Sequence, residues 1–300
     1  MIGRALRRKG GRRLWSPTVA ATGWGESTFA EQAWDKSRGA ATRWAVAGVF
    51  VGLVVGVIAF APAAWLASAV ASATHQRLVL ADARGTVWSG SAVPLLTGGP
   101  DSRDASALPG RVEWTVGLNG LGFELRARQP CCLNGTVAVQ IRPGFGRMTA
   151  TLVPPTGGWV GQWPSAWLGG LGTPFNTLQL GGAIRLMSPG ITFESVQGRW
   201  SVKGRADVEL VGVSSRVSTI DPLGSYRLTL AGDAANPGTS QLTLSTLEGA
   251  LQLSGSGTWG AGGVRFRGEA RAGAADEVAL SNLLNIIGRR DGARSVISIG

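Results

Sequence analysis

The sequence predicts a mainly β protein, in which an N-terminal single transmembrane helix is followed by a curved, elongated antiparallel β-sheet with one or two short helices. Two observations predict this class. Residues 44–70 contain no formal charge, and beyond residue 77 many short runs alternate apolar with polar residues. We expect the sheet to be half-barrel or jelly-roll-like. The predicted division is a basic cytoplasmic tail, disordered or weakly helical, over 1–43, the transmembrane helix over 44–70 and a β domain on the far side of the membrane over 77–300.

The apolar stretch is long enough to cross a membrane. A helix rises about 1.5 Å per residue, so roughly 20 apolar residues cross a hydrocarbon core of about 30 Å. Trp44 and Trp65 bracket the stretch where interfacial aromatic residues are expected. Gly48, Gly52 and Gly56 share one helix face, on which a second copy can pack to form a homo-oligomer. The same spacing can also reflect the glycine-rich composition.

Basic residues are concentrated before the apolar stretch. Residues 1–43 hold nine Lys and Arg residues against three acidic ones, whereas residues 77–300 hold 20 against 15. By the positive-inside rule, the tail stays in the cytoplasm and the residues after the apolar stretch are translocated across the membrane. A cleaved signal peptide is the alternative, because small residues over 67–73 offer cleavage sites. The length of the apolar stretch and of the lead before it favours an uncleaved inner-membrane anchor.

The residues after the apolar stretch follow the two-residue period of antiparallel strands with one buried face. About ten strands are expected, separated by Gly, Asn, Asp or Pro. Asn119-Gly120 and Asn134-Gly135 are typical of tight turns, and Gly262-Gly263 is a weaker turn signal. The alternating runs are 112–116, 123–128, 136–141, 177–180, 183–186, 199–203, 226–230, 241–244, 250–253 and 264–268.

Two segments depart from strand spacing. A Trp- and Gly-rich stretch over 157–174 has room for a short helix around Ser165–Leu168. Asp276–Ile287 opens with two acidic residues and has near-helical apolar spacing, and Gly288 follows as a stop. We expect an amphipathic helix there, before a last strand over Ser295–Ile299.

The chain has two cysteines, Cys131 and Cys132, which are adjacent. Consecutive Cα atoms lie about 3.8 Å apart, below the usual disulfide range of about 4.4–6.8 Å. A bond between these two residues would be strained, so reduced thiols or intermolecular pairing are the alternatives. The sequence favours two small side chains at a strand start after Pro130.

The composition argues against an enzyme and against a nucleic-acid-binding protein. His75 is the single histidine, so no Ser-His-Asp or Cys-His pair can form in the β domain, and no His/Cys cluster can hold zinc. Asp207 and Glu209 share a strand face, where two carboxylates are usually just solvated. The basic excess lies beside the membrane, where it attracts anionic lipid head groups. We expect no catalytic residue, no metal, no cofactor and no nucleic acid.

Several strings in a fixed order behind one apolar stretch carry a family resemblance. The first is a Gly-Thr-x-Trp-x-Gly block, Gly85-Thr86-Val87-Trp88-Ser89-Gly90. The later ones are 221–227 (DPLGSYR), 245–251 (STLEGAL), 255–259 (GSGTW) and 283–290 (LLNIIGRR). Together, the strings resemble protein N of the type II secretion system (GspN), and the resemblance covers about Trp44–Gly300. The chain departs from the family in its long basic lead.

The resemblance implies an accessory inner-membrane component of the machine that exports folded periplasmic proteins across the outer membrane. Its expected partners are other type II secretion subunits of the inner-membrane platform, with the membrane itself contacted by the spanning helix and the basic tail. The family has no catalytic residues to carry over. The rival hypothesis is a periplasmic β-groove protein that binds lipid or transfers it between membranes.

Eight positions are predicted to shape the sheet or to contact partners. The glycines are expected to allow turns or bulges, and the aromatic residues to pack the concave face, each with a polar tip that needs a partner. The alternative is that the aromatic residues line a groove that receives a partner's strand or an acyl chain. These candidate positions are Gly85, Trp88, Gly90, Trp114, Trp200, Gly224, Tyr226 and Trp259.

Overall fold

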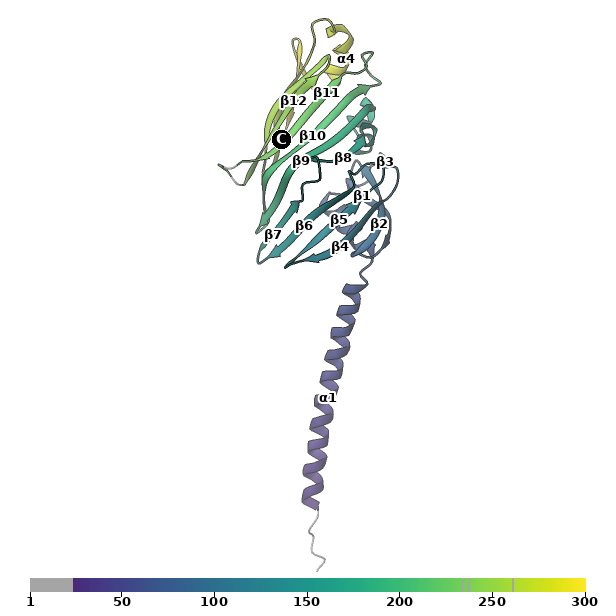
Figure 1. Cartoon of the computed structure of the whole chain (residues 1–300), viewed down its shortest axis with the longest axis vertical. Helices are drawn as coiled ribbons and strands as arrows, with labels where there is room; N and C mark the ends of the chain where they lie inside the picture. Colours follow the sequence, from purple (N-terminus) through teal and green to yellow (C-terminus); the bar gives the residue numbers. More distant parts are fainter. Residues whose placement is uncertain (1–23, 234, 237, 261) are drawn as a thin grey trace, which may run out of the picture. The chain divides into compact units, whose positions relative to one another are not determined.

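The computed structural model describes residues 24–233, 235–236, 238–260 and 262–300, with side chains from residue 42 onward. The chain divides into two compact units, Met1–Ile58 and Ala59–Gly300, and we call the second one the β unit. As predicted, the protein is mainly β, with one large open antiparallel sheet and a few short helices (Figure 1).

The first unit is described as one helix, α1, Trp24–Ala59. Its segment Thr42–Ala59 is long and apolar enough to cross a membrane, and none of it is buried within the protein. The helix begins within the basic tail, in a segment rich in the good helix formers Ala, Glu, Gln and Lys. Residues 1–23 of that tail lie outside the described residues.

The single helix expected over 44–70 is divided in two. Helix α1 ends at Ala59, and a second helix, α2, covers Ala63–Ala73. Pro62, at the N-cap of α2, separates them, because proline has no N–H to donate and its ring clashes with the preceding turn of a continuing helix. Ala61 and Ala63 are buried, so the chain from this point on is part of the β unit rather than of the apolar helix.

The β unit is built on one sheet in which every pairing is antiparallel. The strand order is β1-β2-β4-β5-β6-β7-β9-β10-β11-β12-β13-β14-β16-β15, with β3 added to β2 and β8 added to β9. The strands are β1 Leu78–Gly85, β2 Ser89–Thr97, β3 Ala105–Ala107, β4 Val112–Asn119, β5 Gly122–Arg128, β6 Thr136–Gly144, β7 Arg147–Leu152, β8 Trp159–Pro164, β9 Leu180–Val196, β10 Arg199–Ser215, β11 Gly224–Gly232, β12 Thr239–Glu248, β13 Leu251–Gly260, β14 Gly263–Ala272, β15 Arg289–Asp291 and β16 Arg294–Ile299.

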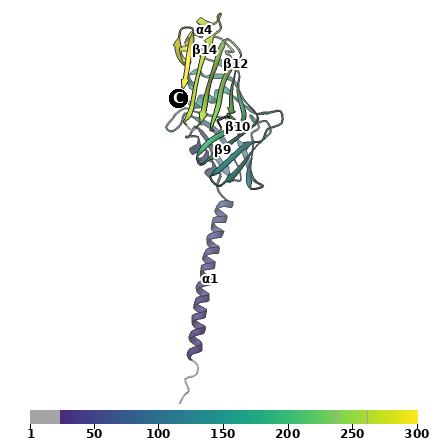
Figure 2. The ribbon, with the colours of Figure 1, turned by 90° about the vertical axis from the view of Figure 1, so that its left-hand side faces the viewer.

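Strands β9 and β10 hold the two halves of the sheet together. Each is 17 residues long, and they pair along nearly their whole length. The C-terminal part of β9 pairs with β7, with Ile191 opposite Leu152, whereas its N-terminal part pairs with β8, with Ala183 opposite Pro164. In Figure 2, β10, β12 and β14 follow one another across the sheet, with α4 (Glu277–Ile287) at one end of them.

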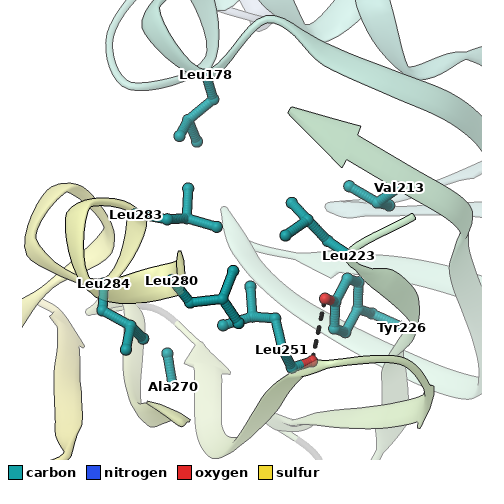
Figure 3. Close-up of a cluster of buried hydrophobic side chains, with 9 residues drawn as sticks. All are labelled: Leu178, Val213, Leu223, Tyr226, Leu251, Ala270, Leu280, Leu283 and Leu284. Carbon is teal, nitrogen blue, oxygen red and sulfur yellow. Dashed lines mark hydrogen bonds between the residues drawn. The ribbon is translucent and has the colours of Figure 1, made fainter. Parts of the chain in front are cut away.

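Two hydrophobic clusters lie on one face of the sheet, which we call the inner face. Helix α4 packs over the larger cluster, to which it contributes Leu280, Leu283 and Leu284, while Tyr226 lies on the other side of Leu251 (Figure 3). Helix α2 covers the smaller cluster, formed by Ala63, Ala92 and Trp114. The opposite, outer face carries charged side chains joined in ion pairs.

The short elements predicted from sequence are largely confirmed. A 3-10 helix, η1, covers Ser165–Leu171. The strand expected over 177–180 is wrong, because a helical turn, α3, covers Phe175–Leu178 and β9 begins only at Leu180. Helix α4 and the last strand, β16, lie within a residue of the predicted bounds. The sheet has more strands than the ten expected, because strands with small or charged residues, such as β3 and β15, lack an alternating pattern.

The expectation for the cysteines is wrong. Cys131 and Cys132 form a disulfide although their Cα atoms are 3.7 Å apart. The bond lies in the connection from β5 to β6, where Cys132 is buried. The Cys132 carbonyl accepts a 2.7 Å hydrogen bond from the Gln162 N–H, so this connection is attached to β8. The usual range of Cα distances in disulfides therefore does not apply to this pair of adjacent cysteines.

Candidate functional site

Four of the predicted positions meet around the β1–β2 hairpin. Gly85 has a φ of +89°, and a Cβ on it would lie 2.5 Å from the Ser89 carbonyl oxygen. A Cβ on Gly90 would lie 2.6 Å from the Trp114 ring. Because both contacts are closer than any side chain allows, glycine at these two positions permits the tight hairpin.

The two tryptophans of this region have different surroundings. Trp114 is buried, and its Nε1–H donates a 3.1 Å hydrogen bond to the Val87 carbonyl, which holds the hairpin over the ring. Trp88 is half-buried, with its ring centroid 6.2 Å from that of Phe123. Trp114 is therefore a core residue with a satisfied polar tip, and Trp88 remains partly accessible.

Gly224 and Tyr226 form a second predicted group, in the other half of the sheet. A Cβ on Gly224 would collide with the Glu248 carbonyl oxygen and would lie 3.0 Å from the Tyr226 hydroxyl. The Tyr226 hydroxyl donates a 3.1 Å hydrogen bond to the Leu251 carbonyl, and burial raises the pKa of this phenol. Tyr226 is thus a structural residue of the larger hydrophobic cluster.

Trp200 and Trp259 lie apart from both groups. Trp200 is 45% exposed near the start of β10. Trp259, in β13, is half-buried, and its ring centroid is 6.3 Å from that of Phe193. The five aromatic residues therefore do not line one shared groove: two belong to separate clusters, and Trp88, Trp200 and Trp259 are the ones a partner can reach.

The two edge strands of the sheet are open surfaces that cannot be recognised from any single residue of the sequence. Among the described residues, strand β1 (Leu78–Gly85) pairs only with β2, so its other side is an open strand edge. The Thr74 hydroxyl bonds to the N–H and C=O of Leu78 at its start, and Arg111 donates to the Asp82 carbonyl. At the far end, β15 is three residues long and faces only Arg294–Val296 of β16, which leaves Ile297–Ile299 without a strand on that side. Strand order comes from pairings between distant residues, so the local pattern cannot reveal which strands are edges.

A hollow of about 610 Å³ with charged side chains in its lining, which we call the charged hollow, lies on the outer face of β1, β2, β4, β5 and β6. Its charged lining consists of Arg84, Glu113, Arg126 and Arg128. Arg128 pairs with Glu113 at 3.2 Å, while Arg84 pairs with Asp82, outside the lining. Each of these arginines is more than half exposed, so its ion pair contributes little to stability. Because the lining holds three arginines and one glutamate, the hollow suits acidic groups of a partner.

The two carboxylates singled out in the sequence are engaged in ion pairs rather than simply solvated. The Glu209 side chain is 9% exposed and pairs with Arg227 at 2.7 Å. Asp207 pairs with Arg205 at 2.9 Å and accepts a hydrogen bond from Thr229. Burial acts to raise the pKa of Asp207, but the hydrogen bonds from Arg205 and Thr229 outweigh it and lower that pKa. Both carboxylates are therefore held in ion pairs with arginine, as is typical of carboxylates that stabilise a fold.

Metal-ligand geometry is likewise missing from the part of the chain that the structure describes. Within it, no group of three or more His, Cys, Asp or Glu side chains could hold a metal ion. The accessible features of the β unit are thus a free strand edge, half-exposed aromatic residues and a charged hollow, which are surfaces for contact.

Comparison with known proteins agrees with this picture. No curated protein and no solved structure matches the chain at a significant level. A family model described as "Type II secretion system (T2SS), protein N" matches residues 76–297, which is nearly the whole β unit. The match confirms the resemblance found in the ordered sequence strings, and the chain belongs to the type II secretion system protein N family.

Proposed function

We propose that the protein is an accessory inner-membrane subunit of the type II secretion system that acts through protein–protein contacts and not by catalysis. Helix α1 anchors it, with the tail in the cytoplasm and the β unit in the periplasm. The observation that carries the proposal is the family match over residues 76–297. The apolar segment Thr42–Ala59 and the basic residues that precede it support the anchor and its orientation.

The β1 edge is the contact surface we assign to another secretion subunit. Adding a strand to an open edge gives main-chain hydrogen bonds, and neighbouring pockets give specificity. Strand β1 is eight residues long, whereas the opposite edge strand, β15, has three. The charged hollow lies beside β1 on the outer face, so acidic groups of the same partner can pair with Arg84 and Arg126.

A photo-crosslinking side chain at the edge tests this contact in the full chain within intact inner membranes. Val79 lies on β1, and Thr243 lies on β12, which is paired on both sides and so serves as the matched control. We expect crosslinks to another secretion subunit from position 79 and few from position 243. Equal yields at the two positions, or none at either, would contradict strand addition at β1.

One observation favours the lipid-binding hypothesis as a second candidate. Between the clusters under α2 and α4, the inner face carries apolar residues that no helix covers, and Leu228 and Met148 stay 36% and 43% exposed. A lipid carrier needs such an apolar lining to be continuous. Replacing Leu228 with Arg in the full chain should lower co-purified lipid if that face holds acyl chains, and should leave it unchanged otherwise.

A further inference from the structure

Three neighbouring hairpins of the β unit have large apolar side chains at or beside their turns that are exposed to solvent. We call them the three tips: residues 118–122 between β4 and β5, 143–148 between β6 and β7, and 196–200 between β9 and β10. Leu121 and Phe145, at the first two turns, are completely exposed, and Leu118 is 82% exposed. Hairpin turns are normally built from Gly, Asn and other polar residues, so these side chains are unusual for a surface in water.

Strand pairing places the three tips at one end of the sheet. Phe123 of β5 lies opposite Ile141 of β6, and Arg147 of β7 lies opposite Val196 of β9. Consecutive tips are therefore joined by adjacent strands. Met148 and Trp200 extend the apolar surface from the second and third tips, and both are more than 40% exposed.

The chain enters the β unit at this same end. The Val87 N–H, in the β1–β2 turn, donates a 2.8 Å hydrogen bond to the Ala61 carbonyl. Ser89 of β2 lies opposite Thr115, four residues before the end of β4 at Asn119, so the first tip extends roughly 14 Å further along the strand direction. Only Phe60 and Ala61 stand between α1 and Pro62, a link of about 10 Å at most.

Arginines accompany the apolar side chains. Arg142 directly precedes the second tip and Arg199 lies within the third, and both are exposed. Neither has an ion pair among the described residues, whereas Arg147 pairs with Glu194 at 3.1 Å. The next turn at the same end of the sheet, between β11 and β12, is polar instead: Asp233 accepts a hydrogen bond from the Ala235 N–H. At the β13–β14 turn Val264 is 40% exposed beside Arg265, but the completely exposed side chains, Leu121 and Phe145, lie at the tips nearest the entry of the chain.

We propose that the three tips dip into the interface of the membrane that α1 crosses. Leu121 and Phe145 lie among the upper acyl chains, and Arg142 and Arg199 pair with lipid phosphates. In membrane-bound proteins, aromatic residues commonly lie at the membrane interface, and neighbouring arginines extend from an apolar surface to the lipid phosphates. The inference rests on the proposed anchoring of the chain by α1. It adds a second membrane contact, which limits how the β unit can turn about its anchor.

Photo-crosslinking to lipid tests this contact with the full chain alone in nanodiscs of phosphatidylethanolamine and phosphatidylglycerol. A p-benzoylphenylalanine replaces Phe145 or Leu121. The matched control is Val278 of α4, which is also highly exposed but lies at the other end of the β unit (Figure 1). Several-fold more lipid adduct from positions 145 and 121 than from 278 is the expected result. Equal adducts, or crosslinks between two copies of the chain, would overturn the proposal.

A charge variant provides an independent readout. Arg142→Gln with Arg199→Gln should lower the lipid adduct at position 145 in discs with phosphatidylglycerol, because it removes the cations that pair with phosphate. No decrease would overturn the assigned role of these arginines. Because the discs contain no other protein, a negative result leaves the secretion-subunit proposal untouched. Release of the chain from discs at alkaline pH would instead overturn the anchor, and this inference with it.

Discussion

The Tyr226 hydroxyl donates a 3.1 Å hydrogen bond to the carbonyl of Leu251 across an intervening strand, and both residues are buried. Tyr226 belongs to β11 and Leu251 to β13, so the bond joins strands that are not neighbours in the sheet. Leu251 also contacts the cluster under α4. This one hydrogen bond therefore connects β11 with β13, beneath helix α4.

Tyr226→Phe should lower the free energy of unfolding by about 1 kcal/mol, because it removes a buried hydrogen bond and keeps the ring. Urea unfolding of the purified full chain measures this difference. Trp200→Phe is the matched control, since Trp200 is exposed and its replacement should change stability by less than about 0.5 kcal/mol. Equal effects of the two substitutions would contradict the structural role of Tyr226.

Tyr226 is the single tyrosine of the chain, so its ionisation can be followed directly. Burial raises the pKa of the phenol, and the folded protein should show no tyrosinate absorbance at pH values where the unfolded chain ionises, about 10. The stability that the neutral phenol contributes is complete below the unfolded pKa and is lost as the pH rises above it. Ultraviolet difference spectra would disprove the burial if tyrosinate formed before unfolding.

Gly85→Ala should destabilise the β1–β2 hairpin by at least about 1 kcal/mol from backbone strain alone, since Gly85 has a φ of +89°. Contact with the Ser89 carbonyl oxygen adds to this cost. A Cβ on Gly117, in β4, would have open space around it, so Gly117→Ala should be neutral or slightly stabilising. Thermal unfolding of both variants separates the two cases, and similar midpoints would refute the assignment.

The pKa of Asp207 is lowered in the folded protein, because the hydrogen bonds from Arg205 and Thr229 outweigh the effect of burial. A lowered folded pKa stabilises the protein above the unfolded pKa of about 3.9, and this stability is lost as the pH falls through the folded pKa. Asp207→Asn should therefore reduce the loss of stability on acidification. Unfolding midpoints measured from neutral pH down to about 3 test this, and parallel curves for the two proteins would argue against it.

The periodic parts of the fold could be predicted from sequence. Alternating residues identified β4, β5 and β11, and the acidic start and apolar spacing identified α4. The need for glycine at Gly85 and Gly90 was likewise readable, because a tight hairpin beside an aromatic ring leaves no room for a side chain. These features depend on neighbours in the chain.

The features set by distant contacts could not be predicted. Pro62 interrupts the apolar run, but only the burial of Ala61 and Ala63 within the β unit shows that the chain leaves the apolar helix there. The disulfide of Cys131 and Cys132 and the burial of Glu209 beside Arg227 depend on the tertiary fold in the same way. The exposed tips at Leu121 and Phe145 were also missed, because their exposure follows from the pairing of strands.

The most direct test of the account is a crosslinking pull-down of the full-length chain from intact inner membranes, with the bound fraction analysed for both proteins and lipids. Membership of the protein N family and the free β1 edge predict recovery of other type II secretion subunits. That recovery should fall when crosslinking is confined to Thr243 on the fully paired strand β12 rather than Val79. Co-purified lipid with no secretion subunit would contradict the account and favour the lipid-binding hypothesis.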